Sequence, residues 1–296
     1  MIGHPEILPG FAWRDIDADG TRIRVATAGK GPPLLLLHGH PQNHLTWHKV
    51  APMLAHRFSV ILTDLRGYGD SAKPASNSDH APYSKRAMAR DQVAVMRALG
   101  HERFQLVGHD RGGRVAHRMG LDFPEAVERM VVIDIAPTAT MYARTNMDFA
   151  RAYFWWFFLI QPFPLPEHLI GGDPEFFLDR QLERQHKVPG MADPRVVAEY
   201  RRCYMDPAAR HAMCEDYRAA AGIDLEHDAT DADARLAMPL LALWGALGTV
   251  GRLYNVMETW REKALDVRGE ALPCGHSPQE EVPAELLREL GRFLVA

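Results

Sequence analysis

The chain has 296 residues, of which 47% are hydrophobic and 24% are charged, and a chain of this size can form one large core with an insertion. Its net charge of -4 at pH 7 gives no sign of a nucleic-acid partner. Three widely spaced cysteines without a CxxC pair argue against a disulfide framework or zinc knuckle. Because it lacks a leader-like N-terminal stretch and a long apolar run, we expect a soluble cytoplasmic protein without membrane association.

Apolar runs and helical patterns alternate along the chain, which is typical of a doubly wound, mostly parallel sheet. The continuous aliphatic run at residues 33–37 predicts a strand buried on both faces. Further strands are predicted at residues 21–28, 58–63, 104–107, 129–134, 239–244 and within 264–272. Helices are predicted at residues 45–56, 85–99, 115–123 and 283–294. In such a sheet, ligands bind at the carboxyl ends of the strands.

The pattern changes between residues 137 and 235. This segment loses strand-like runs and becomes rich in aromatic residues, prolines and amphipathic helical stretches. An insertion of this length cannot be a structureless loop. We therefore predict a helical cap at residues 137–235 over a core formed by residues 1–136 and 236–296. Most of the cap's aromatic side chains are expected to pack cap against core rather than to contact a substrate.

The strongest chemical signal lies at residues 108–114, Gly-His-Asp-Arg-Gly-Gly-Arg. A strand-like run precedes this segment and a helix-like run follows it, which is the context of a nucleophile elbow. The central residue is Asp110 rather than a serine, which argues against a conventional serine esterase. A carboxylate that attacks a saturated carbon forms a covalent alkyl ester, and water can cleave that ester later.

The partners of this nucleophile follow from the chain order of catalytic triads. His276 stands in a Gly-His pair after the last predicted strand, where a general base would activate water against the ester. The loop after residues 241–245, a common place for the triad acid, contains no carboxylate. Asp134, at the end of the preceding strand, is therefore the predicted acid. The alternative is that Asp134 only caps the next segment.

A backbone oxyanion hole is predicted at residues 38–41, His-Gly-His-Pro, directly after the aliphatic strand. Its donors would be the N–H groups of His40 and of Arg111, the residue after the nucleophile. The clustered histidines at 38, 40, 44 and 48 could instead form a metal site, but their spacing matches no known ligand motif. We therefore predict neither a metal nor an organic cofactor.

Arg111 and Arg114 indicate the kind of substrate. They lie three residues apart at a helix start and so occupy neighbouring positions on one face. Two guanidinium groups beside an attacking carboxylate would bind a second carboxylate through paired hydrogen bonds. They would also offset its repulsion from Asp110. The alternative for Arg114 is a surface residue that pairs with an acid. We predict a small substrate with its own carboxylate.

Taken together, these motifs resemble those of the fluoroacetate (haloacetate) dehalogenases, a family of α/β hydrolases. The likeness extends over nearly the whole chain and includes the cap strings Gly-Gly-Asp-Pro at 171–174 and Cys-Glu-Asp-Tyr-Arg-Ala at 214–219. The resemblance implies the α/β-hydrolase fold with an inserted helical cap and a homodimer. It also implies five roles, namely nucleophile Asp110, acid Asp134, base His276, and carboxylate ligands Arg111 and Arg114.

The resemblance further implies a halide pocket formed by a histidine, a tryptophan and a tyrosine of the cap. Trp156 and Tyr217 correspond to two of these, but Trp155 takes the place of the histidine. An indole has one N–H donor and cannot become cationic, and losing one preorganised donor commonly costs about 10²–10³ in rate. Chloride and bromide need less help than fluoride when they leave. Gln185 also stands where the family places a tryptophan.

The sequence thus predicts a hydrolytic dehalogenase that converts chloroacetate or bromoacetate, and fluoroacetate with more difficulty, to glycolate and halide through an ester of Asp110. The main alternative is an epoxide hydrolase with the same triad, in which Tyr142, Tyr153 or Tyr217 would donate to the epoxide oxygen. A neutral epoxide has no use for the arginine pair. A non-catalytic ligand-binding protein is a third hypothesis, but it would be expected to show a broken triad.

Overall fold

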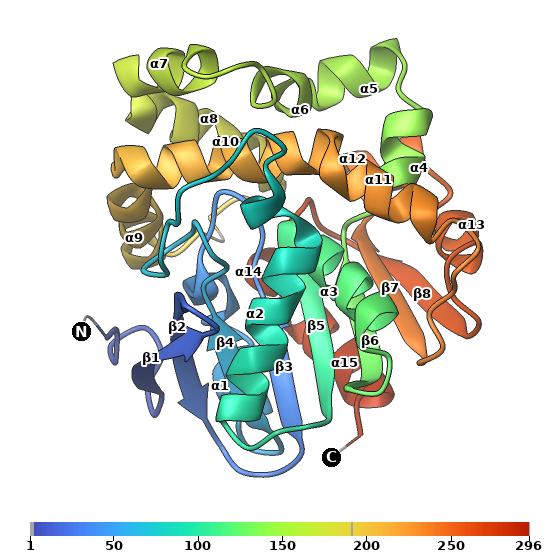
Figure 1. The fold of residues 1–296 in the computed structure, drawn as a ribbon. Helices are drawn as coiled ribbons and strands as arrows, with labels where there is room; N and C mark the ends of the chain where they lie inside the picture. Colours follow the sequence, from blue (N-terminus) through green and yellow to red (C-terminus); the bar gives the residue numbers. More distant parts are fainter. Residues whose placement is uncertain (1–2, 191, 296) are drawn as a thin grey trace.

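The computed structural model describes residues 3–190 and 192–295 and has an eight-stranded sheet at its centre (Figure 1). The strands are β1 (Ala12–Ala18), β2 (Thr21–Ala28), β3 (Pro33–Leu37), β4 (Ser59–Thr63), β5 (Phe104–His109), β6 (Val127–Ile133), β7 (Leu240–Gly245) and β8 (Val267–Leu272). They are arranged in the order β1-β2-β4-β3-β5-β6-β7-β8. The pairs β1–β2 and β2–β4 are antiparallel, and all later pairs are parallel. The predicted doubly wound, mostly parallel sheet is confirmed.

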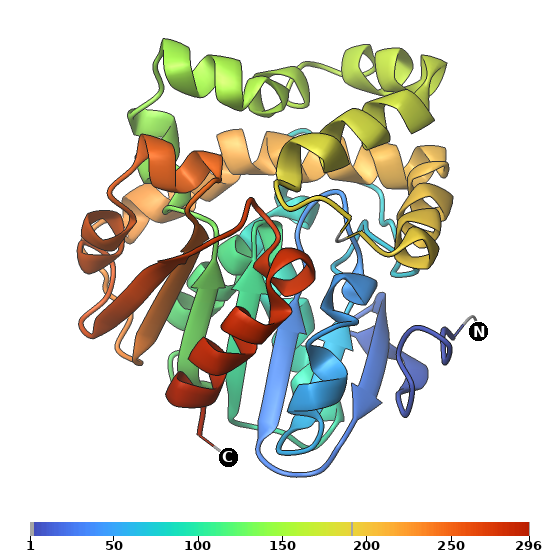
Figure 2. The same ribbon diagram turned by 180° about the vertical axis from the view of Figure 1, so that it is seen from behind.

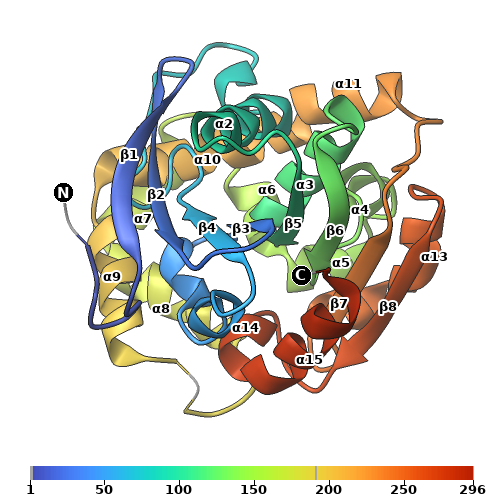
Figure 3. The same ribbon diagram turned by 90° about the horizontal axis from the view of Figure 1, so that it is seen from below.

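Helices cover both faces of the sheet, which is why its central strands are aliphatic. Seen from below, α2 and α3 lie on one face, and α1, α14 and α15 lie on the other (Figure 3). Their bounds are α1 (Ala51–Leu54), α2 (Lys85–Ala98), α3 (Arg111–Asp122), α14 (Pro278–Glu281) and α15 (Pro283–Phe293). Two short helices, α12 (Thr249–Leu253) and α13 (Val256–Arg261), pack near β7 and β8. Leu34 to Leu37 of β3 are fully buried, as expected for a strand between two helical layers.

Two features of the core differ from the prediction. β1 was not predicted, because it is an edge strand in which Arg14 and Asp15 face solvent and the apolar signal is weak. The prediction of a single helix at residues 45–56 is wrong. The segment instead contains the 3-10 helix η1 (His44–Trp47) and the separate helix α1, in which Pro52 occupies the first turn. Proline has no N–H to donate, so it is accepted at the start of a new helix rather than inside a long one.

The helices between β6 and β7 form a layer above the carboxyl ends of the parallel strands (Figures 1 and 2). They are α4 (Thr138–Ala143), α5 (Met147–Ala152), α6 (Phe154–Phe158), α7 (Leu165–Gly172), α8 (Pro174–Gln185), α9 (Pro194–Tyr204), α10 (Pro207–Ala221) and α11 (Ile223–Thr230). A 3-10 turn, η2 (Ala81–Tyr83), approaches α10 from the core. Among the described residues, no helix is both long enough and apolar enough to cross a membrane.

Candidate active site

Asp110 lies at a strained elbow between β5 and α3. Its φ of 46° and ψ of -113° are unusual for a residue with a side chain. The turn is closed by glycines, since a Cβ at Gly108 would lie 2.5 Å from the carbonyl oxygen of Gly112. A Cβ at Gly112 would lie 2.5 Å from the carbonyl oxygen of His38. The elbow places the Asp110 carboxylate above the sheet edge, in contact with a cavity.

A cavity of about 280 Å³ separates the sheet edge from the cap. Its lining combines titratable groups of the core with mainly aromatic groups of the cap. The core contributes His40, Asp110, Asp134 and His276, and the cap contributes Tyr153, Trp155, Trp156, Gln185 and Tyr217 among others. The structure therefore brings most of the predicted site residues together around one cavity, at the carboxyl ends of the strands.

The three predicted triad residues lie in contact. The Nδ1 of His276 donates to the Oδ2 of Asp134 at 2.5 Å, and the Nε2 of His276 lies 3.7 Å from the Oδ2 of Asp110. The other oxygen of Asp134 accepts from the backbone N–H of Gly245 at 3.0 Å. The Asp134 carboxylate is therefore held in place from β7 and fixes the orientation of the imidazole ring, with Nε2 directed at Asp110.

Charge coupling sets the ionisation of this group. Burial would raise the pKa of Asp110, but the nearby positive charges, that of His276 first, hold this pKa well below its usual range. Burial would lower the pKa of His276, but the hydrogen bond and charge of Asp134 and the charge of Asp110 outweigh it, so this pKa is raised. The Asp110 carboxyl is consequently ionised at neutral pH, and its charge favours the protonated form of His276.

The oxyanion-hole prediction places two backbone donors near Asp110. The N–H of His40 donates to the Oδ1 of Asp110 at 3.0 Å. Gly39 allows this approach, because a Cβ there would lie 2.5 Å from the Cβ of Asp110. Arg111 begins α3, where backbone N–H groups have no acceptor within the helix. One oxygen of Asp110 is therefore already held by the predicted hole, and the other is not.

The two predicted carboxylate ligands stack against rings that line the cavity and are not themselves part of the lining. The Cζ of Arg111 lies 4.2 Å from the ring centroid of Tyr217, and that of Arg114 lies 4.7 Å from the ring centroid of Trp156. Both arginines are buried, so the alternative of a surface position for Arg114 is wrong. Within the described residues, the Nη1 of Arg111 and the Nε of Arg114 have no hydrogen-bond partner. A bound carboxylate would satisfy these buried donors.

Sequence reasoning missed Asp216, which holds Arg111 from the cap helix α10. The Nε and Nη2 of Arg111 donate to the two Asp216 oxygens at 2.8 and 2.6 Å. Asp216 also accepts from the hydroxyl of Tyr68 at 2.7 Å and pairs with Lys85. The fully buried carboxylate of Asp216 thus occupies the Nε and Nη2 donors of Arg111 and leaves Nη1 without a hydrogen bond. Its signal in the sequence is the string at residues 214–219, which contains two acidic residues.

The residues expected to bind halide, Trp155, Trp156 and Tyr217, all line the cavity. Trp155 is only partly buried, and the guanidinium of Arg184 lies 5.0 Å above its ring. Tyr153 also lines the cavity, whereas Tyr142 packs on Trp156 with ring centroids 5.1 Å apart. Two of the three candidate tyrosines therefore face the space above Asp110.

The four clustered histidines do not converge on a metal position. The Nδ1 of His44 contacts Asp64 at 2.8 Å, whereas that of His48 contacts the carbonyl of Leu45 at 2.9 Å. The rings of His38 and His40 have their own separate partners, the backbone of residues 39 and 65 and the side chain of residue 181. The alternative of a histidine metal site is not supported by this arrangement.

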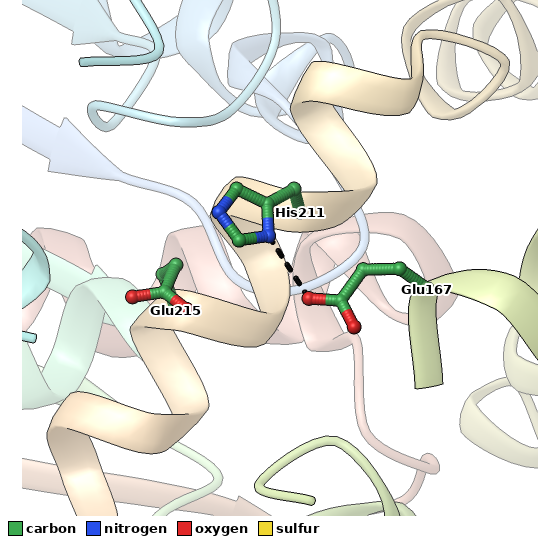
Figure 4. A group of neighbouring side chains, drawn as sticks. All are labelled: Glu167, His211 and Glu215. Carbon is green, nitrogen blue, oxygen red and sulfur yellow. Dashed lines mark hydrogen bonds and ion pairs between the residues drawn. The ribbon is translucent and has the colours of Figure 1, made fainter. Parts of the chain in front are cut away.

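A different group, Glu167, His211 and Glu215 of the cap, has ligand atoms within 4.8 Å of one another (Figure 4). Its carboxylates are already paired. The Nη1 of Arg218 lies 2.7 Å from an oxygen of each glutamate, and the Nδ1 of His211 lies 2.9 Å from Glu167. We interpret this group as an ion-pair cluster between α7 and α10.

Several known proteins are similar to this chain over most of its length. Residues 32–283 match the family described as the alpha/beta hydrolase fold. A fluoroacetate dehalogenase from Burkholderia sp is 44% identical, over 96% of this chain and 94% of its own length. A soluble epoxide hydrolase from Corynebacterium sp. (strain C12) is 32% identical, over 90% and 91%. A solved structure from Salmonella enterica, provisionally called an acyltransferase, has a TM-score of 0.96 at 60% identity and covers 97% of this chain and 96% of its own.

Proposed function

Because the chain belongs to the α/β hydrolases and, within them, to the fluoroacetate dehalogenase family, we propose that it is a hydrolytic dehalogenase of haloacetates. One observation carries the proposal. The elbow carboxylate of Asp110 faces the cavity, and Arg111 and Arg114 beside it each keep a buried N–H donor without a partner. Such a site suits a substrate that is attacked at carbon and carries a carboxylate of its own.

In the first step, the substrate carboxylate accepts hydrogen bonds from Arg111 and Arg114, which turns the halogen-bearing carbon towards Asp110. The Oδ1 of Asp110 is held by the N–H of His40, so Oδ2 is the oxygen that attacks. A carbon–oxygen bond forms as the carbon–halogen bond breaks, and the halide leaves with the bonding electron pair. The indole N–H groups of Trp155 and Trp156 and the hydroxyl of Tyr217 would stabilise the departing halide.

In the second step, the ester of Asp110 is hydrolysed. Alkylation removes the negative charge of Asp110, which is one of the charges that raise the pKa of His276. The neutral imidazole then takes a proton from water, and the water oxygen attacks the Cγ of Asp110. The negative charge that develops on Oδ1 is stabilised by the N–H groups of His40 and Arg111. The bond between Cγ and the ester oxygen breaks, glycolate leaves with the proton from His276, and the restored Asp110 carboxyl loses the remaining proton of the water to solvent.

An epoxide hydrolase is the second candidate, and one observation favours it. Tyr153 and Tyr217 both line the cavity, and burial raises the pKa of each hydroxyl well above its ordinary value. Two protonated hydroxyls could donate to the oxygen of an epoxide as Asp110 opens the ring. The arginine pair speaks against this candidate, because an uncharged epoxide leaves both unpartnered N–H groups unsatisfied.

The two candidates are separated by measuring halide release from fluoroacetate, chloroacetate and bromoacetate beside the hydrolysis of styrene oxide. We expect halide release, fastest from bromoacetate and chloroacetate, and loss of this activity in Asp110→Asn. Epoxide turnover without halide release from any of the three acids would overturn the proposal in favour of the second candidate.

We further propose that the protein is a cytoplasmic homodimer that requires no cofactor and binds neither nucleic acid nor membrane. Three buried, unpaired cysteines suit a reducing compartment. A set of large apolar side chains on or beside α5 to α8 is exposed to solvent and offers a face for a second copy. The set comprises Met147, Phe154, Phe163, Leu165, Leu169 and Phe176.

A further inference from the structure

We propose that Glu281 is a positioning residue for His276 and that it acts by tying the loop of the base to one segment of the cap, residues 185–188. The proposal rests on the function proposed above, because it concerns the step in which His276 activates water. Glu281 ends the short helix α14, a few residues after the base, and its side chain is buried.

The carboxylate of Glu281 accepts four backbone hydrogen bonds from two separate parts of the chain. Two come from the base loop, namely the N–H of Gly275 to Oε2 and that of Ser277 to Oε1, both at 3.0 Å. Two come from the cap, namely the N–H groups of Lys187 and Val188 to Oε2, at 2.7 and 2.9 Å. A buried carboxylate with this many donors is satisfied, and its charge strengthens each bond.

The backbone of His276 itself is held by the same cap segment and by the residue before the nucleophile. Its N–H donates to the carbonyl of Gln185 at 2.8 Å, and its carbonyl accepts from the Nε2 of His109 at 2.7 Å. The side-chain amide of Gln185 donates in turn to the carbonyl of His40 at 2.9 Å. The cap segment 185–188 therefore touches both the loop of the base and the loop of the oxyanion hole.

The base loop and the cap segment 185–188 are packed closely at Gly275. A Cβ added at Gly275 would lie 2.4 Å from the carbonyl oxygen of Gln185 and 3.0 Å from the Oε1 of Glu281. If Glu281 lost its hydrogen bonds, the loop could shift and carry the imidazole away from the ester. Displacement of halide by Asp110 requires no proton transfer to His276, whereas attack by water does. Glu281 should therefore influence the second step and leave the first almost unchanged.

Glu280 provides a matched control on the same helix. It is as buried as Glu281 and also ties α14 to the cap, through His186 at 2.6 Å and the hydroxyl of Tyr200 at 2.6 Å. Its carboxylate forms no hydrogen bond to residues 275–277. Glu280→Gln thus weakens the contacts of α14 with His186 and Tyr200 but leaves the four hydrogen bonds of Glu281 in place, so it separates weaker cap attachment from the loss of those four bonds.

The test follows the two steps separately in the full-length enzyme with chloroacetate. In a single turnover with excess enzyme, the initial burst of chloride release reports alkylation, and the rise and decay of the Asp110 ester in the intact-protein mass spectrum report hydrolysis. In Glu281→Gln, an NH2 group replaces one acceptor oxygen. We expect a burst rate within about twofold of wild type, and ester hydrolysis slowed about 10- to 100-fold, so that the ester accumulates. In Glu280→Gln, the ratio of the two rates should equal that of wild type.

Equal slowing of both steps in Glu281→Gln, or an unchanged hydrolysis rate, would overturn the proposal. If Glu281→Gln does not fold, as judged by circular dichroism, Gly275→Ala disturbs the same joint from the other side and must show the same selective slowing. A folded Gly275→Ala enzyme with wild-type hydrolysis would also overturn it. A wild-type enzyme that releases no chloride from chloroacetate contradicts the proposed function instead, so the two failures are distinguishable.

Discussion

Among individual residues, Asp110 controls the site through its charge. While Asp110 is ionised it raises the pKa of His276, and the conversion of Asp110 to an ester in the proposed mechanism would remove that effect. Below its pKa, His276 is protonated and cannot accept a proton from water. We therefore expect the rate constant of ester hydrolysis to fall as the pH is lowered through the pKa of His276 in the ester, which lies below the value in the free enzyme.

The chloride burst should show no such dependence, because alkylation needs only the ionised Asp110, whose pKa lies well below the ordinary value. Rapid-quench measurements of both steps across the neutral pH range would check this difference. A burst rate that falls together with the hydrolysis rate would show that His276 takes part in the first step and contradict the assignment.

Trp155 is the residue expected to affect which halide leaves most readily. It lines the cavity, where the resemblance places a histidine, and its indole offers one donor that cannot become cationic. We expect Trp155→His to raise the ratio of kcat/KM for fluoroacetate to that for chloroacetate by about tenfold or more. Trp155→Phe keeps a ring beneath Arg184 but has no donor, and should not raise the ratio. An unchanged ratio in Trp155→His would place this residue outside the halide site.

Among the secondary-structure elements, α10 links the cap to the proposed substrate-binding residue Arg111, because Asp216 orients its guanidinium. Asp216→Asn leaves Arg111 and Lys85 buried with less negative charge, and breaking such a pair typically costs about 3–5 kcal/mol. We expect the free energy of unfolding, measured with urea, to fall by about this amount and the KM for chloroacetate to rise.

Glu215→Gln, one residue earlier, is the control, because Glu215 pairs with His80 and Arg218 outside the cavity. It should destabilise the cap but leave KM unchanged, and a wild-type KM in Asp216→Asn would refute the role of Asp216.

The elements with strong local signals were predictable from the sequence. The predicted bounds of β2 and β3 equal those in the structure, because burial of the strand faces gives such strands a clear apolar pattern. The elbow around Asp110 was recognisable, because its small residues and flanking elements are contiguous in sequence. β1 was missed, because an edge strand needs few apolar residues.

The supporting contacts of the site could not be predicted in the same way. Asp216 lies 105 residues from Arg111, and Glu281 lies 94 residues from Lys187. Neither pairing follows from a local period or a turn signal, since it depends on how the cap is seated on the core. The burial of two consecutive acids, Glu280 and Glu281, is likewise a result of tertiary packing. Sequence patterns therefore indicated the candidate reacting groups but not the residues that hold them.

For the molecule as a whole, the exposed apolar side chains of the cap predict self-association. Phe163 and Phe176 are 67% and 61% exposed, and burying such a face against a second copy would be favourable. We expect wild type to be a dimer in light scattering coupled to gel filtration, and Phe163→Glu with Phe176→Glu to be a monomer. Met53→Glu, at a residue exposed on the core, is the control and should remain dimeric. A monomeric wild-type protein would refute the homodimer.

The covalent route through Asp110 can be tested in a single turnover of chloroacetate by excess enzyme in ¹⁸O-labelled water. Water attacks the Cγ of Asp110 in the proposed mechanism, so the oxygen transferred to carbon comes from the enzyme. We expect unlabelled glycolate in this first turnover and one ¹⁸O atom in the peptide that contains Asp110. Labelled glycolate with an unlabelled Asp110 peptide would show that water displaces the halide directly, and would contradict the role of Asp110 as nucleophile.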